Sequence, residues 1–174
     1  MNVHALISEQ RETVQPLDPA QLAAANINPA TGLATDYLNH FNEAIMMLDL
    51  VPTMPACIED LMQWRVMSYR EHFLSTHQKN RDLVLAAYEQ ADPRAKRALD
   101  ELTESMDVIL TICCDALNLD LSSRVVDALA QEAASQLKPL VARAGAVING
   151  HTLSTEGTLP GAPQATVDAL MERR

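Results

Sequence analysis

The sequence contains few of the residues that β proteins depend on. Aromatic residues make up only 3% of the chain, and 5 of its 174 residues are glycine. Strands prefer aromatic and β-branched side chains, and no Asn-Gly or Asp-Gly pair stands between two alternating apolar runs, as a hairpin would require. Hydrophobic residues still make up 48%, so the core must be built largely from leucine, isoleucine, valine, methionine and alanine. Because most of these favour helices, the composition predicts an all-α protein.

Patterns that mark several functional classes are also missing. The sequence has no phosphate-binding loop, dinucleotide fingerprint, nucleophile elbow or paired Cys-x-x-Cys. Its three cysteines are an odd number with one adjacent pair, which favours free thiols in a reducing compartment. The first four residues lack the basic and apolar regions of a signal peptide, and apolar runs such as residues 44–48 are far shorter than the roughly 20 residues that span a bilayer. We therefore predict a cytoplasmic protein without a cofactor.

The charge of the chain is strongly negative. Its formal net charge is -10 and its pI about 4.8, so it should repel phosphate backbones and anionic membrane surfaces. The basic residues between 64 and 100 alternate with acidic ones and do not cluster with aromatic residues. We expect neither a nucleic acid nor a membrane as partner.

Composition changes along the chain divide it into four segments. Residues 1–33 contain three prolines and are expected to form a partly irregular N-terminal arm. Residues 34–149 carry apolar residues at helical spacing and form the predicted helical bundle domain. Residues 150–163 have the composition of a flexible linker. Residues 164–174 are expected to form a short amphipathic C-terminal helix.

Five helices are predicted within the bundle domain. They span residues 35–49, a short segment from 55, residues 69–87, residues 93–117 and residues 122–148. A capping box at Ser68–Glu71 and a cap-plus-proline pair at Asp92-Pro93 mark two of the starts, while Pro139 predicts a kink or break in the last helix. The two long C-terminal helices should form an antiparallel hairpin, and the helices from 35 and 69 should complete an antiparallel four-helix-type bundle.

The fourth predicted helix carries two informative stripes. Its apolar residues alternate steps of four and three, as in a coiled-coil seam: Ala95, Leu99, Leu102, Met106, Ile109, Cys113 and Ala116. Beside them runs an acidic stripe of Asp100, Glu104 and Asp107. Basic residues of the third helix, such as Arg70, are available as its ion-pair partners.

An unusually polar group accompanies the apolar stripes of the first and third helices. Its members are the candidate lining of a ligand pocket: Tyr37, His40, Glu43, Tyr69, His72 and Asn80. A histidine that is neutral near pH 7 could act there as an acid or base. No nucleophile is placed beside it by the sequence.

Histidines on facing helices also raise the question of a metal site. His40, His72 and His77 are the candidate ligands, since bundles hold iron or manganese with inward-facing imidazoles and carboxylates. Di-metal bundles use Glu-x-x-His, however, whereas this chain has His40-x-x-Glu43, and Glu71 is already used by the capping box. The simpler interpretation is that these histidines lie at the core boundary and hydrogen-bond locally.

The C-terminal segment Gln-Ala-Thr-Val-Asp-Ala-Leu-Met at 164–171 resembles the receiver-docking tail of the chemotaxis response-regulator phosphatase. The resemblance covers these eight residues and the layout of a helical hairpin, a linker and a terminal helix. It implies that Val167, Asp168, Leu170 and Met171 dock a partner protein. That family's catalytic Asp and Gln lie four apart, as Asp127 and Gln131 do here, although its surrounding Phe-Gln-Asp-x-Thr-Gly-Gln pattern is missing.

Three functional interpretations follow from the sequence. The leading one is a non-catalytic helical regulatory or interaction protein, in bacterial signalling, that binds another protein. The alternatives are a phosphatase or regulator of a phosphorylated receiver domain, and a metal- or small-ligand-binding bundle. A homodimer is compatible with the apolar residues Val125 and Val141 beside the main stripe of the last helix.

Overall fold

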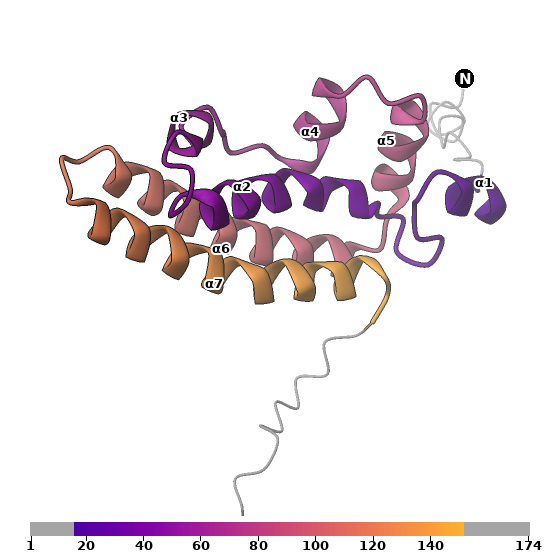
Figure 1. Cartoon of the computed structure of the whole chain (residues 1–174). Helices are drawn as coiled ribbons and strands as arrows, with labels where there is room; N and C mark the ends of the chain where they lie inside the picture. Colours follow the sequence, from indigo (N-terminus) through magenta and orange to yellow (C-terminus); the bar gives the residue numbers. More distant parts are fainter. Residues whose placement is uncertain (1–15, 152–174) are drawn as a thin grey trace, which may run out of the picture.

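The chain folds into helices joined by short loops (Figure 1). The computed structural model describes residues 16–151, and this range contains helices and no strand. In chain order the elements are α1 (Pro19–Ala24), the 3-10 helix η2 (Thr35–Leu38), α2 (Asn39–Leu50), α3 (Cys57–Leu61), α4 (Tyr69–Ser75), α5 (Arg81–Gln90), α6 (Pro93–Leu117) and α7 (Ser123–Ile148). The predicted all-α class is confirmed. None of these helices is long and apolar enough to cross a membrane.

Three long helices form the centre of the molecule. Helices α6 and α7 run antiparallel, and α2 packs along α7, while α3, α4 and α5 stand on the same side of α2 (Figure 1). One continuous core holds them together; its largest fully buried side chains include Phe41, Phe73, Leu99, Met106, Leu110 and Leu137. The predicted four-helix-type arrangement is not confirmed, because short helices stand where its fourth member was expected.

The helix predicted from residue 69 to 87 is in fact two helices. It begins at the predicted capping box, in which the Ser68 hydroxyl and the Glu71 carboxylate each bind the other residue's backbone N–H. It ends at Ser75, because the Ser75 and Thr76 hydroxyls donate to the carbonyls of His72 and Phe73, and Thr76 itself is extended. Side-chain hydrogen bonds of this kind compete with helix continuation. An ion pair between Arg70 and Glu89 ties α4 to α5.

The two long helices follow the predicted bounds closely. Asp92 caps α6 by accepting the Arg94 N–H at 2.9 Å. Helix α7 passes through Pro139 without the predicted break. Pro139 cannot donate to the Ser135 carbonyl, but both residues are exposed, so water can satisfy that carbonyl and the helix continues.

The loop before η2 is part of the core. Ile27, Leu33 and Ala34 are fully buried. The Thr31 hydroxyl donates to the Ile148 carbonyl at 2.6 Å, and the Asp92 N–H donates to the Thr31 carbonyl at 3.1 Å. The loop thereby joins the end of α7 to the start of α6. Residues 16–33 of the predicted arm therefore share the core of the helical body.

Candidate functional site

A groove of about 530 Å³ lies between the second half of α2 and the segment that starts with α3. Its lining comprises His40, Glu43, Met46, Met47, Leu50, Cys57, Asp60, Gln63, Trp64, Arg65 and Met67. Helix α2 supplies one wall, since Glu43, Met46, Met47 and Leu50 are spaced at three and four residues and share one side of the helix. Residues 57–67 supply the other wall.

Apart from Glu43, the α2 wall of the groove is apolar, and it is open to solvent. The Met46 side chain is 56% exposed and that of Leu50 36%, and Met54 follows beyond the end of α2 at 53%. Exposed apolar side chains that cluster often mark a binding surface. Methionine is flexible and polarisable, so that a methionine-lined surface adapts to differently shaped partners.

His40 fixes the second wall of the groove to α2. Its Nε2 lies 2.8 Å from the Arg65 carbonyl oxygen, and because a carbonyl only accepts, Nε2 carries the proton. The indole N–H of Trp64 donates to the backbone carbonyl of His40 at 3.2 Å. The two rings stack with centroids 4.8 Å apart. Residues 64 and 65 are therefore held against α2 at one position.

The environment of His40 keeps its imidazole neutral. Burial lowers the pKa of His40, against the opposing influence of the Arg65 carbonyl and the Glu43 carboxylate. Burial also lowers the pKa of His72, and His40 lowers it further. Both changes disfavour the imidazolium form. The arrangement suits a structural hydrogen bond better than proton transfer, since Nε2–H is already engaged.

Four of the residues predicted to line a ligand pocket, His40 among them, have their rings close together on the side of His40 away from Trp64. The Tyr37 ring centroid lies 5.2 Å from that of Tyr69 and 5.6 Å from that of His72, and those of His40 and His72 are 6.0 Å apart. Tyr69 also stacks on Tyr88 at 4.4 Å. We call Tyr37, Tyr69, His72, Phe73 and Tyr88 the ring cluster. It brings together residues that were predicted to line a ligand pocket and packs them against one another.

The remaining predicted ligand residues lie apart from the ring cluster. Glu43 is exposed and lines the groove, whereas Asn80 is exposed at the start of α5. His77 lies on the exposed turn between α4 and α5. Within residues 16–151, no three His, Cys, Asp or Glu side chains converge as metal ligands would.

The residues singled out by the family resemblance are only partly described. Asp127 and Gln131 lie one turn apart on α7; Gln131 is exposed and Asp127 half-buried. Their role in dephosphorylating a receiver stays a prediction. Val167, Asp168, Leu170 and Met171 lie outside the described residues.

Asp107 on α6 is a half-buried acid, one of whose carboxylate oxygens is fully buried. Its Oδ1 has no partner among the described residues, and Arg70, a predicted partner of the acidic stripe, pairs with Glu89 instead. Burial, and then the charge of Glu104, raise the pKa of Asp107 to about 6 from its ordinary 3.8. Burial, and then the negative charge of Asp107, raise the pKa of Tyr37, whose hydroxyl donates to the Met67 carbonyl.

Asp107→Asn is expected to stabilise the protein at neutral pH. A carboxyl whose pKa is higher in the folded than in the unfolded state lowers the free energy of unfolding when it is ionised. This destabilisation is complete above the folded pKa of about 6 and disappears as the pH falls towards the ordinary pKa of 3.8. Allowing for partial solvation, the amide should raise the free energy of unfolding by about 1–2 kcal/mol at pH 7.5 and by little at pH 4.5. Urea unfolding at both pH values measures this difference. Glu101→Gln on the exposed side of α6 is the control, and a loss of stability in Asp107→Asn at pH 7.5 would contradict the argument.

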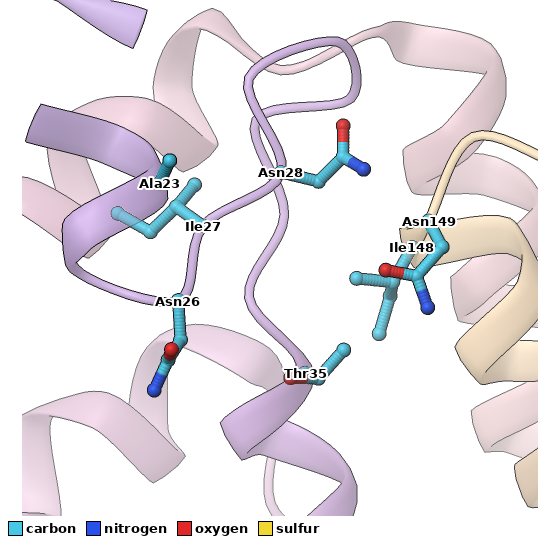
Figure 2. Close-up of a pocket in the computed structure, with 7 residues that line it drawn as sticks. All are labelled: Ala23, Asn26, Ile27, Asn28, Thr35, Ile148 and Asn149. Atoms are coloured by element: carbon cyan, nitrogen blue, oxygen red, sulfur yellow. The ribbon is translucent and has the colours of Figure 1, made fainter. Parts of the chain in front are cut away.

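A smaller pocket of about 240 Å³ lies at the opposite end of the molecule. Figure 2 shows that Ala23, Asn26, Ile27 and Asn28 reach it from α1 and the following loop, and Ile148 and Asn149 from the end of α7. The Asn28 side-chain oxygen already accepts the Ala30 and Thr31 N–H groups. No residue that lines this pocket titrates near neutral pH, so it offers no acid–base chemistry.

The main groove was not predicted from the sequence. The signal that could have located it is the distribution of methionine, because five of the eight methionines fall between residues 46 and 67. Comparison of the chain with protein-family models, with curated proteins and with solved structures finds no significant match. The function must therefore be inferred from the groove itself.

Proposed function

We propose that this chain is a non-catalytic interaction protein, and that the groove between α2 and α3 binds an apolar helical segment of another protein. The observation that carries the proposal is the exposed apolar wall formed by Met46 and Leu50. These two side chains are four residues apart and lie one above the other on α2. A helix laid along such a wall buries apolar surface on both partners.

The charges around the groove indicate the kind of partner helix. Glu43 and Asp60 are exposed in the lining, while Arg65 is the basic residue there. The chain as a whole has a net charge of -10. A partner that carries basic residues beside its apolar face would approach faster and bind in a defined orientation, because the charges are complementary.

Met46→Asp is expected to abolish binding of such a helix. The probe is a synthetic peptide of about 18 residues, with leucine on one helical face and lysine on the other. Trp64 is the single tryptophan of the chain and lines the groove, so its fluorescence reports binding. A charge in the apolar wall should weaken the affinity by at least about tenfold, which corresponds to about 1.4 kcal/mol.

Ile112→Asp provides the matched control for this experiment. Ile112 is 64% exposed on α6 and does not line the groove, so this substitution adds the same charge elsewhere. Equal affinities of the two variants would mean that the peptide binds through net charge alone and would refute the groove as its site. Both variants should unfold at nearly the wild-type temperature, because both side chains are exposed.

A further inference from the structure

We infer that residues 164–174 of this chain bind in its own groove between α2 and α3 and compete there with the partner. The inference rests on the proposed function of the groove. Three features support this occupant: its apolar spacing, its basic residues and its reach.

The apolar residues of the C-terminal segment match those of the α2 wall in spacing. If residues 164–174 form the helix that their sequence predicts, Val167, Leu170 and Met171 share one side of it. The α2 wall of the groove presents Met46 and Leu50 at the spacing of one helical turn. Two short apolar stripes of similar length can therefore lie against each other.

Charge can orient this segment in the groove, although its side chains sum to no net charge. Two consecutive arginines stand at 173 and 174, one turn beyond Leu170, while Asp168 and Glu172 are its acidic residues. The groove presents the exposed carboxylates of Glu43 and Asp60 on its two walls. Opposite charges at these places would fix the direction in which the segment lies.

The linker is long enough to bring the segment to the groove. Lys138 of α7 donates to Asp49 at the end of α2 at 2.9 Å, so this part of α7 lies next to the groove's α2 wall. From residue 138 to 151, α7 and its last turn lead away over about 20 Å (Figure 1). Residues 152–163 can span at most about 40 Å when extended. The linker is therefore long enough for the chain to turn back along α7 and reach the groove. A short tether also gives the segment a high effective concentration there.

The test compares the full-length chain with a double variant, Leu170→Asp with Met171→Asp. Loss of the docked segment should uncover Trp64, so that acrylamide quenches its fluorescence more strongly and its emission moves to longer wavelength. Leu159→Asp in the linker is the control and should leave the quenching unchanged. The leucine–lysine peptide should bind the double variant more tightly than the wild type, by about tenfold if the segment fills the groove in nine molecules of ten.

The outcomes separate this inference from the proposed function. Stronger quenching in the double variant supports docking of the segment in the groove, even if the peptide fails to bind; in that case the proposed function, and with it competition with a partner, is wrong. Unchanged quenching together with peptide binding that depends on Met46 overturns the inference and leaves the proposed function standing. A difference in quenching that disappears on dilution would identify the occupant as the segment of a second copy, and would overturn binding within one chain.

Discussion

Gly32→Ala is expected to lower the free energy of unfolding by about 3 kcal/mol or more. Gly32 has a φ of +73°, a conformation that alanine adopts only under strain. A Cβ there would also lie 2.9 Å from the Ala87 carbonyl oxygen and 2.9 Å from the Ala91 Cα. These are backbone atoms of α5 and of the residue that follows it, so no side-chain rotation can relieve the overlap. Thermal and urea unfolding of the purified variant measure the loss.

The other described glycines separate the two causes of this loss. Gly150 shares the positive φ, at +75°, but a Cβ there would meet only the Thr31 methyl at 3.7 Å, so Gly150→Ala should show backbone strain alone, about 1 kcal/mol. Gly145 lies within α7 and has room for a methyl group, and Gly145→Ala should be neutral or stabilise the helix by up to about 1 kcal/mol. Losses of equal size at residues 32 and 150 would show that the overlap with α5 contributes nothing.

Tyr69→Ala is expected to destabilise the protein by about 3–5 kcal/mol. Tyr69 is 3% exposed and lies at the centre of the ring cluster, with its ring centroid 4.8 Å from that of Phe73 and stacked on Tyr88. Truncation would leave a cavity that several rigid rings cannot fill by small movements. Urea unfolding at pH 7.5 measures the change.

Tyr69→Phe isolates the contribution of the hydroxyl. The Tyr69 oxygen accepts the Ala34 N–H at 2.8 Å, and Ala34 is fully buried. Phenylalanine would keep the ring packing but leave that N–H without a partner, at a cost of about 1–3 kcal/mol. Tyr88→Phe, in a half-buried ring, is the control and should change stability by less than about 0.5 kcal/mol. If Tyr69→Phe behaves like the control, water must replace the lost hydrogen bond.

The starts of α4 and α6 could be predicted because short-range chemistry decides them. Ser68 and Asp92 each cap the helix that follows, and Asp92 precedes a proline at the first helical position. The end of α4 was missed because Phe73, Thr76, Asn80 and Ala87 keep helical spacing across the turn, although residues 75–82 are all polar. That spacing says nothing of the local hydrogen bonds that end the helix at Ser75.

The seam of α6 was predicted only along its first part. Ala95, Leu99, Leu102, Met106 and Cys113 are buried as expected, but Leu110 and Leu117 are buried where Ile109 and Ala116 were predicted. A nearly straight helix drifts relative to a strict seven-residue repeat, since it has 3.6 residues per turn. Towards the C-terminal end of α6, the buried stripe therefore lies one residue beyond the positions that a coiled-coil repeat predicts.

The candidate site depends on contacts that the sequence does not encode locally. Tyr37, His40, Tyr69 and His72 were identified from their polarity, and the structure does bring their rings together. Residues 62–67 decide which faces of these rings are covered, and their sequence shows no helical or strand periodicity. The position of Trp64 against His40 is a long-range contact of this kind, and it decides where the groove lies.

The hydrogen bond between the Thr31 hydroxyl and the Ile148 carbonyl has a consequence for the order in which the chain is built. It joins residues 117 positions apart in the sequence. During synthesis from the N-terminus, Ile27 and Thr31 of that loop are made long before the end of α7 beside which they lie. The local pairing of α6 with α7 can form quickly once both have left the ribosome, whereas closure of the loop over α7 must come last. Until then the nascent chain leaves Ile27 uncovered on the side where Ile148 later lies.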